Sequence, residues 1–303
     1  MLRKFILFTL LIGLINACSP QATPTAAALA FTDGLGRQVT LNGPAQRVVS
    51  LAPSNTEILF AIGAGKQVIG RDQLSDFPEE AKAVADIGST FDALNTELIV
   101  AQKPDLVLAA EINTPEQVKQ LENLGLTVYY LKNPLTLEGM YDNLNVVAQM
   151  TGHTQETAKL VESLKARVAA VDEKIAPLSA RMNVFYELDG TDPAKPYTAG
   201  KGTFITQLID RAGGHNIAAD IEGYPQLSLE QVVAADPAFI ILGDARYGIT
   251  PESIAQRPGW ESLTAVKDGH VVPFNDDLVS RPGPRLVDAL EELAKLLRPE
   301  LFQ

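Results

Sequence analysis

Cysteine is almost absent from this sequence, because Cys18 is the only one in 303 residues. A single cysteine cannot form a disulfide within the chain, so the fold cannot depend on one. Histidine is also scarce, and His153, His215 and His270 lack the spacing of a metal cluster. The sequence therefore predicts no metal site and no intrinsic cofactor held by such a cluster.

Basic residues are outnumbered, since 25 Lys and Arg face 37 Asp and Glu and give a formal net charge of −12. This balance argues against nucleic acid as a partner, because phosphates repel an acidic surface. The sequence also lacks the G-x-S-x-G elbow of many hydrolases and the H-E-x-x-H signature of zinc proteases. These absences argue against an enzyme, and an extracytoplasmic hydrolase stays open as the less favoured alternative.

Long apolar runs are confined to the N-terminus. Two cationic residues precede the apolar stretch 5–15, which has the length of a signal-peptide core and is short for a membrane span. A small residue and Cys18 follow, which resembles the lipobox of bacterial lipoproteins. We expect 1–17 to be a signal peptide, Cys18 to carry a lipid, and 18–30 to form a tether. The mature protein would then be extracytoplasmic and anchored to the cell membrane, at the cell surface or in the periplasm. An ordinary signal peptide with an incidental cysteine is the alternative.

Strand-like and helix-like stretches alternate along the first part of the chain. Apolar runs typical of buried strands are separated by stretches with helix start and stop signals. Such alternation predicts parallel sheets with helices on both faces. The expected strands are 47–52, 68–70, 106–109 and 127–131, and the expected helices are 56–62 and 115–124.

The alternation is interrupted by residues 155–176, which contain neither Gly nor Pro. Apolar residues recur there at spacings of three and four, which predicts one amphipathic helix of roughly 30 Å. After Pro177 the alternation restarts. The expected strands there are 182–188, 239–242 and 270–274, and the expected helices are 203–212 and 284–297. The sequence thus predicts an α/β fold of two three-layer lobes, 31–150 and 178–303, joined by a single long rigid helix within 151–177.

One phrase occurs twice, once in each expected lobe. The stretches NTELIVAQKPDLVLA, from Asn95, and SLEQVVAADPAFIIL, from Ser228, both place a Glu two positions after a polar residue and a Pro seven positions after that Glu. A helix ended by the proline and followed by a strand explains the body of the phrase. The shared acid, Glu97 or Glu230, is not explained by this reading, although a helix N-terminus favours acids.

Several stretches, taken in order, resemble a known family. They are FTDGLGRQVTL, RVVSLAPSNTEILFAIGAGKQVIG, SDFPEEAK, NTELIVAQKPDLVLA, PYTAGKGTF, GGHNIA and SLEQVVAADP. From Phe31 to the C-terminus the chain resembles the substrate-binding proteins of iron-siderophore, haem and vitamin B12 ABC transporters, and among these most of all the B12-binding type.

The resemblance implies a class III periplasmic-binding-protein fold that holds its ligand between two lobes. It implies a monomer that delivers a small-molecule metal chelate to an ABC permease dimer driven by a cytoplasmic ATPase. In the family, one surface glutamate on each lobe docks against arginines of the permease, and those positions match Glu97 and Glu230. An Arg–carboxylate pair can be bidentate, which would fix orientation as well as attraction. A ligand-sensing lipoprotein that signals without transport is an alternative.

By the same resemblance, loops that follow the strands line the ligand cleft. Phe91, Tyr197 and Tyr224 match aromatic residues that contact the corrin ring, while Asp277 and Arg281 match polar groups near its nucleotide side. Flat aromatic side chains pack well against macrocycles. The expected ligand contacts are Ser54, Asn55, Leu74, Phe91, Tyr197, Tyr224, Asp277 and Arg281.

Three positions depart from the B12-binding pattern, because Leu74, Leu278 and Val279 stand where it has aromatic residues. A corrinoid such as cobalamin or cobinamide is favoured, and haem or a ferric siderophore stays open as the alternative. Haem would need an axial ligand, which Tyr197 or Tyr224 could supply.

Overall fold

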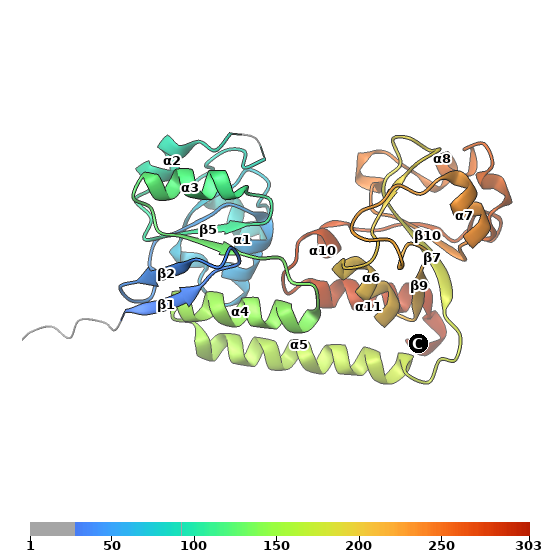
Figure 1. Cartoon of the computed structure of the whole chain (residues 1–303). Helices are drawn as coiled ribbons and strands as arrows, with labels where there is room; N and C mark the ends of the chain where they lie inside the picture. Colours follow the sequence, from blue (N-terminus) through green and yellow to red (C-terminus); the bar gives the residue numbers. More distant parts are fainter. Residues whose placement is uncertain (1–27, 92) are drawn as a thin grey trace, which may run out of the picture.

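The computed structural model describes residues 28–91 and 93–303. Two α/β lobes stand side by side on one long helix (Figure 1). The predicted signal peptide, Cys18 and most of the predicted tether lie outside the described residues. Within the described ranges, no helix combines the length and the hydropathy needed to cross a bilayer.

A parallel four-stranded sheet forms the centre of the N-terminal lobe. Its strands lie in the order β4-β3-β5-β6. They are β3 (Val48–Ser50), β4 (Val68–Arg71), β5 (Leu106–Ala110) and β6 (Val128–Leu131). All four coincide with strands that the sequence predicts, because short apolar runs buried on both faces are typical of parallel sheets.

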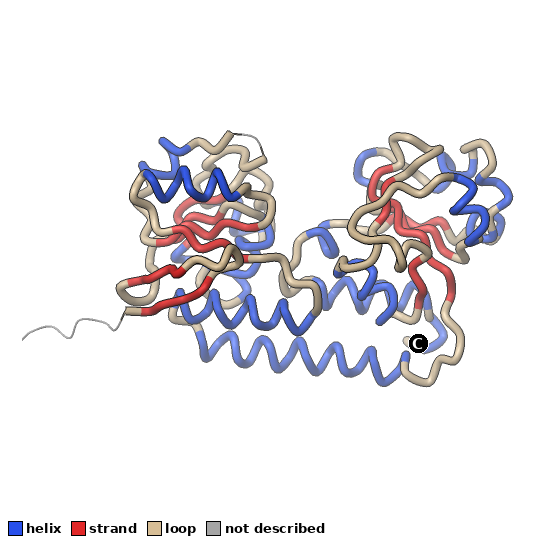
Figure 2. Tube along the Cα trace, viewed as in Figure 1, coloured by secondary structure: helices blue, strands red, loops and turns tan. Residues whose placement is uncertain are grey.

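Each face of this sheet is covered by helices (Figure 2). Leu106 and Leu108 belong to the core shared with α1 (Pro53–Ala61) and α4 (Leu137–Thr151). Val107 belongs to a separate core, which it shares with α2 (Thr96–Ala101) and α3 (Pro115–Asn123). Successive strand residues point to opposite faces, so one apolar strand supplies two cores and produces three layers.

An antiparallel hairpin precedes this lobe, formed by β1 (Leu29–Thr32) and β2 (Gln38–Leu41). β1 begins two residues inside the expected tether, because Leu29 pairs with Leu41 and packs against the main core. The hairpin turn is held by Asp33, whose carboxylate accepts hydrogen bonds from the backbone N–H groups of Leu35 (3.0 Å), Arg37 (3.0 Å) and Tyr130 (3.2 Å).

The C-terminal lobe contains a five-stranded sheet in the order β11-β10-β7-β8, with β9 also paired to β7. The strands are β7 (Met182–Asp189), β8 (Tyr197–Thr198), β9 (Gly214–Asn216), β10 (Phe239–Leu242) and β11 (Val271–Pro273). Helices α6 (Phe204–Arg211) and α11 (Leu286–Leu297) cover one face. The other face packs against α7 (Leu229–Ala235), α8 (Pro251–Ala255), α9 (Thr264–Lys267) and the fully buried Trp260. The predicted two-lobed α/β architecture is confirmed.

Helix α5 (Thr154–Ile175) is the long helix that the sequence predicts, and it runs beneath both lobes (Figure 1). It has 22 residues, which is about 33 Å of helix. Its buried residues recur every three or four positions; they are Thr157, Val161, Leu164, Val168, Val171 and Ile175. Helix α4, which packs beside it, was not predicted, although Thr136 caps it and Gly152 ends it with a φ of 84°.

Helix α5 joins the lobes through packing and ion pairs. Leu144 of α4, Leu164 of α5, Leu208 of α6 and Leu290 of α11 belong to one continuous apolar core. On the outside of α5, Arg167 pairs with α11 through Asp288 (2.6 Å) and Glu291 (2.8 Å). Asp172 of α5 pairs with Arg211 of α6 (2.8 Å). Because a helix without Pro or Gly resists bending, this base holds the two lobes in a fixed relation.

We expect Asp33→Asn to lower the free energy of unfolding by about 1–3 kcal/mol at pH 7, because an amide cannot accept all the donors that the carboxylate accepts. Burial tends to raise the pKa of Asp33, but the hydrogen bonds from Arg37, Tyr130 and Leu35 lower it below its usual value. A lowered carboxyl pKa gives stability above the unfolded-state pKa that is lost as the pH falls. The difference between the variant and the wild type should therefore shrink below about pH 4, as measured by urea unfolding at several pH values.

The exposed Asp142 on α4 makes no hydrogen bond or ion pair with the described residues, so Asp142→Asn is the matched control. An Asp33→Asn effect that is no larger than the control, or that grows as the pH falls, would contradict this account of the hairpin.

Candidate functional site

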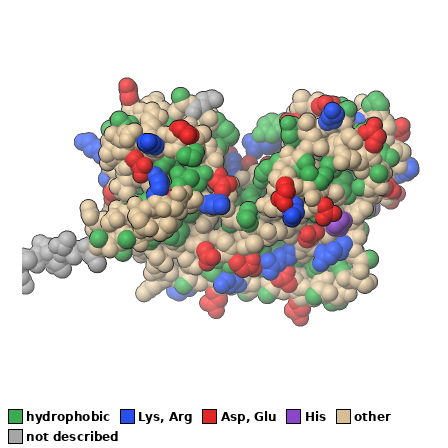
Figure 3. Space-filling view, viewed as in Figure 1, with side chains coloured by type: hydrophobic (Ala, Val, Ile, Leu, Met, Phe, Trp, Pro, Cys, Tyr) green, Lys and Arg blue, Asp and Glu red, His purple; other side chains and the backbone are tan. Residues whose placement is uncertain are grey.

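The molecular surface is hollowed between the two lobes (Figure 3). A cavity of about 260 Å³ lies there, and we call it the cleft cavity. Its walls come from loops that follow β3, β4, β5 and β6 in one lobe and β10 and β11 in the other. The lining residues are Ala52, Pro53, Ser54, Leu74, Phe91, Ala110, Ile112, Asn133, Arg246, Tyr247, Asp276, Asp277, Ser280, Arg281 and Pro282. Ligands of open α/β sheets bind at this carboxyl end of the strands.

Five of the eight expected ligand contacts line the cleft cavity. They are Ser54, Leu74, Phe91, Asp277 and Arg281. Tyr197 and Tyr224 lie outside its wall and are exposed on the C-terminal lobe. Burial raises the pKa of Tyr224, and the charges of Glu111 and Asp276 add to this effect.

Asn55 lies beneath the cleft floor and does not line the cavity. The expected loop at residues 53–55 is instead the first turn of α1, which begins at Pro53 because proline suits the first helical position. Asn55 is 1% exposed, and its Nδ2 donates to the backbone oxygen of Leu108 (3.0 Å). This bond holds α1 against β5 and so positions Ser54.

Apolar and aromatic side chains stand on both sides of the cleft. Leu74 and Phe91, which is 60% exposed, belong to the N-terminal lobe. Tyr247, which is 77% exposed, faces the cleft cavity from η3 (Ala245–Tyr247) of the other lobe. Tyr247 was not predicted, although its place in the loop after the β10 strand is the signal that the other predicted contacts share.

The floor of the cleft cavity is acidic. Asp276 precedes α10 (Asp277–Ser280) and accepts hydrogen bonds from the hydroxyls of Tyr186 (2.8 Å) and Ser280 (2.5 Å). Burial raises the pKa of Asp276, although these two hydrogen bonds oppose the effect. Asp277 pairs with Arg246 (2.6 Å).

Arg281 is a structural residue as much as a cleft residue, because it pairs with three carboxylates. They are Asp76 (2.6 Å), Asp277 (3.2 Å) and Glu57 (3.3 Å). Glu57 lies in α1 of the N-terminal lobe, with 1% of its side chain exposed, and its Oε2 also accepts from Nε of Arg285 (2.7 Å). Burial raises the pKa of Glu57, and the two guanidinium groups oppose this effect. This inter-lobe ion network connects α1 to the segment between α10 and α11.

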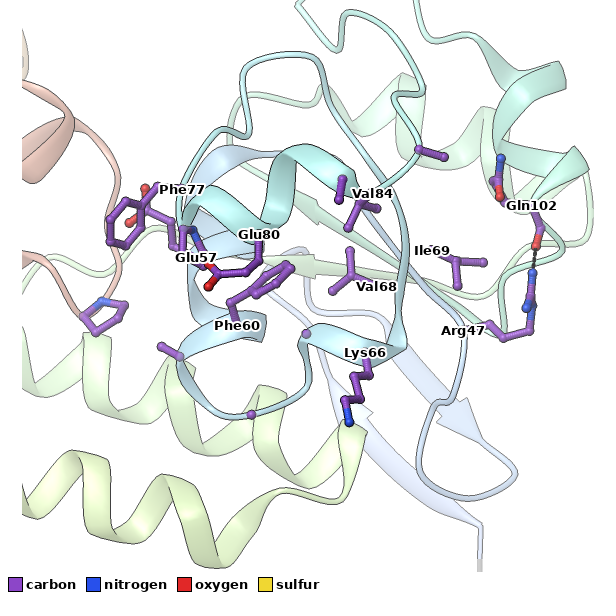
Figure 4. A pocket seen from close by; sticks show the side chains of 17 residues that line it. Arg47, Glu57, Phe60, Lys66, Val68, Ile69, Phe77, Glu80, Val84 and Gln102 are labelled. Atoms are coloured by element: carbon purple, nitrogen blue, oxygen red, sulfur yellow. Dashed lines mark hydrogen bonds between the residues drawn. The ribbon is translucent and has the colours of Figure 1, made fainter.

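A larger cavity than the cleft cavity lies elsewhere among the described residues. It has a volume of about 1020 Å³ and lies along the N-terminal lobe beside α1 and η2 (Glu79–Ala83) (Figure 4). Its walls are mostly apolar and include none of the expected ligand contacts. At one end it meets the inter-lobe ion network through Glu57 and through Phe77, whose ring centre is 4.0 Å from the guanidinium of Arg285.

The duplicated phrase corresponds to a duplicated piece of structure. Glu97 is the second residue of α2, after the capping residue Asn95, and Glu230 is the second residue of α7, after the capping residue Ser228. Both glutamates are exposed. Each helix is followed by a residue of positive φ directly before the proline. These residues are Lys103 (49°) and Asp236 (40°).

Residues 48–278 match the family described as periplasmic binding protein. The chain belongs to the periplasmic binding protein family. This membership confirms the resemblance seen in the sequence and the expectation that the chain is a binding protein and not an enzyme.

Relatives of this periplasmic binding protein have differing names. The uncharacterized ABC transporter substrate-binding lipoprotein YvrC of Bacillus subtilis is 33% identical over 89% of this chain and 86% of its own length. A cobalamin-binding protein of Halobacterium salinarum is 32% identical over 92% of this chain and 74% of its own. The solved apo structure of the haem-binding protein RhuT from Roseiflexus superposes with a TM-score of 0.75 at 29% identity, covering 85% and 99% of the two chains. Family membership therefore does not identify the ligand, and the residues of the cleft have to be considered for that.

The three histidines of this periplasmic binding protein do not line the cleft cavity. His153 bonds to Gln67 (2.9 Å), and the ring of His270 stacks on Phe239 with 4.5 Å between ring centres. In the part of the chain that the structure describes, no group of three or more His, Cys, Asp and Glu side chains has the arrangement of a metal site.

We expect Glu57→Gln to lower the free energy of unfolding by about 3–5 kcal/mol, because it leaves the largely buried guanidinium of Arg285 without its counter-charge and removes one of the three carboxylates that pair with Arg281. Urea unfolding at neutral pH measures this change. Glu79→Gln is the control, since Glu79 pairs with Lys82 at the surface (2.7 Å), where ion pairs contribute less than about 1 kcal/mol. Equal effects of the two variants would show that the inter-lobe ion network does not stabilise the fold.

Proposed function

We propose that this protein is the extracytoplasmic substrate-binding protein of an ABC importer and that it captures a corrinoid between its two lobes. Membership of the periplasmic binding protein family supports the transport role. The observation that carries the choice of ligand is the chemistry of the cleft cavity, where apolar and aromatic walls surround an acidic floor whose neighbouring cations are already paired.

The walls suit a flat macrocycle. Phe91 and Leu74 on one lobe face Tyr247 on the other, and the exposed Tyr197 and Tyr224 extend the aromatic surface beyond the enclosed volume. Aromatic rings contribute contact area with few rotatable bonds, so they stack on a ring system at a small entropic cost. A ligand larger than the cleft cavity would sit partly within it and partly against these exposed rings.

The charges favour a corrinoid over haem and over anionic ferric chelates. Both arginines that line the cleft cavity, Arg246 and Arg281, already pair with carboxylates. Haem carries two propionates, which would face Asp276 and Asp277 without a free cation to receive them. A corrin ring carries carboxamides, which donate hydrogen bonds to carboxylates, and its cobalt centre adds positive charge. The cobalamin-binding relative from Halobacterium salinarum supports the same choice.

Haem is the alternative ligand, and the similarity to RhuT keeps it open. An iron ligand would have to come from the tyrosines, because no His, Cys or Met lines the described cleft cavity. Tyr224 suits this role poorly, since burial and nearby acids raise its pKa and so disfavour the phenolate that would bind ferric iron. A ferric siderophore meets the same acidic floor.

We further propose that Glu97 and Glu230 dock against arginines of the permease dimer, whose partner ATPase drives release of the ligand. One exposed acid on each lobe at equivalent helix positions defines a docking axis across the cleft. The acid alone is ordinary, because Glu116 of α3 and Glu252 of α8 occupy the same position in their own helices. Glu97 and Glu230 differ from these two acids because each lies in the structural unit that occurs once in each lobe. That unit is a helix followed by a residue of positive φ and a proline. A lipid on Cys18 would keep the protein, acting as a monomer, beside that permease.

We expect dicyanocobinamide and cyanocobalamin to bind at least ten-fold more tightly than haemin or ferrichrome, as measured by titration followed through ligand absorbance. Trp260 is fully buried in a core away from the cleft cavity, so its fluorescence would be a poor reporter. Phe91→Ala and Tyr224→Ala should each weaken corrinoid binding by about ten-fold, because each removes an aromatic contact. Leu124→Ala, which changes an exposed residue outside the cleft, should have no effect. Tighter binding of haemin than of any corrinoid would reject the proposed ligand.

For docking, we expect the double variant Glu97→Lys, Glu230→Lys to keep its ligand affinity within two-fold and to lose at least nine-tenths of ligand-stimulated ATPase activity of the transporter in membrane vesicles. Reversal of both charges replaces attraction to permease arginines by repulsion. The matched control is Glu116→Lys, Glu252→Lys, which makes the same change at the same helix position on both lobes. Equal activity of the two double variants would remove the support for Glu97 and Glu230 as docking residues.

A further inference from the structure

A second cavity adjoins the cleft on the C-terminal lobe, and we call it the side cavity. It has a volume of about 410 Å³ and lies at the carboxyl ends of β7 and β10, the same sheet edge that forms the cleft floor. Its lining residues are Leu188, Asp189, Thr191, Asp244, Tyr247 and Ile249. None of these residues belongs to the set expected to contact ligand.

Tyr247 lines both the side cavity and the cleft cavity. Its hydroxyl makes no hydrogen bond to any described residue, and its ring is held by the guanidinium of Arg246 at 5.4 Å from the ring centre. An exposed aromatic side chain with so few restraints changes rotamer readily. Because Tyr247 lines both cavities, it is the side chain that they share.

The charged groups of the side cavity are two carboxylates, and its other polar side chains are the hydroxyls of Thr191 and Tyr247. Oδ1 of Asp189 accepts from the backbone N–H of Thr191 (2.8 Å), and Oδ2 of Asp244 accepts from that of Gly190 (2.8 Å). Oδ1 of Asp244 is buried and has no donor among the described residues. Among the described residues, no Lys or Arg lines the side cavity.

The buried cation near Asp244 is already paired. Arg257 makes a bidentate pair with Glu187 through contacts of 2.5 Å and 2.9 Å. Burial raises the pKa of Asp244, although the hydrogen bond from Gly190 and the charge of Arg257 oppose the effect. Gly190 keeps this arrangement compact, because a side chain there would collide with Glu187 and Arg257. The wall is therefore compact and acidic.

We propose that the side cavity is a specificity subsite for one peripheral arm of the ligand. It accepts an uncharged or cationic arm that donates hydrogen bonds, and it rejects an arm that ends in a carboxylate. Asp244 discriminates between the two kinds of arm, and Tyr247 is the movable side chain between this subsite and the cleft cavity. The inference rests on the proposed corrinoid function, since the peripheral carboxamides of a corrinoid are arms of this kind. An amide can donate a hydrogen bond to the carboxylates of the wall, whereas a carboxylate would face their negative charge.

The test compares dicyanocobinamide with its monocarboxylates, which are made by mild acid hydrolysis of single peripheral amides. For the wild type, calorimetric titration should show at least one monocarboxylate that binds ten-fold or more weakly than the parent amide. Asp244→Asn keeps an acceptor and removes the charge, so the penalty for that monocarboxylate should shrink at least three-fold. Asp142→Asn should leave the penalty unchanged.

A second pair of variants does not depend on a buried change. Thr191→Trp fills the side cavity from an exposed position and should weaken binding of the parent amide by ten-fold or more. Leu124→Trp, which enlarges an exposed residue outside both cavities, should bind as the wild type does. If the wild type binds corrinoids and both Asp244→Asn and Thr191→Trp behave like it, the proposed role of the side cavity is rejected and the proposed function is not. Failure of the wild type to bind any corrinoid overturns the proposed function and this inference together.

Discussion

The carboxylate of Glu57 is buried between Arg281 and Arg285, and the relation between the two lobes depends on it. Glu57 belongs to the first helix of one lobe, whereas both arginines lie more than 220 positions later in the sequence. A charge so deeply buried is tolerated only with its partners in place, and separating the lobes would break the contacts of Glu57 with both arginines. With α5 and the shared core below, this inter-lobe ion network favours a cleft that is already formed before ligand arrives.

The same network determines the chemistry of the cleft. Arg281 would be the natural receptor for an anionic ligand, but Glu57, Asp76 and Asp277 occupy its guanidinium. The cleft is left with acceptors and aromatic rings, and that combination suits an amide-bearing macrocycle better than a dicarboxylate. In the proposed function, the stability of the fold and the choice of ligand are coupled, because the Arg281 guanidinium that connects the lobes is not free to bind an anionic ligand.

Sequence patterns were sufficient for the features that depend on local periodicity. The four strands of the N-terminal sheet, strands β7, β10 and β11, the long helix α5 and the paired positions of Glu97 and Glu230 follow from apolar spacing, capping residues and prolines. The short strands β8 and β9 were not predicted. Features that depend on distant partners were not predictable. The burial of Asn55 requires the carbonyl of Leu108, and the pairing of Arg281 requires α1. The side cavity forms where the carboxyl ends of β7 and β10 lie side by side, so no single stretch of sequence predicts it.

The central claim is that the lobes keep one orientation when ligand binds. It is tested most directly by double electron–electron resonance between spin labels at Lys119 on α3 and Glu252 on α8, with Cys18 replaced. The account predicts one narrow distance distribution that shifts by less than about 3 Å when dicyanocobinamide is added, as in pre-organised complexes. A broad distribution without ligand, or a shift of more than about 10 Å on binding, would show a hinged protein and contradict the account.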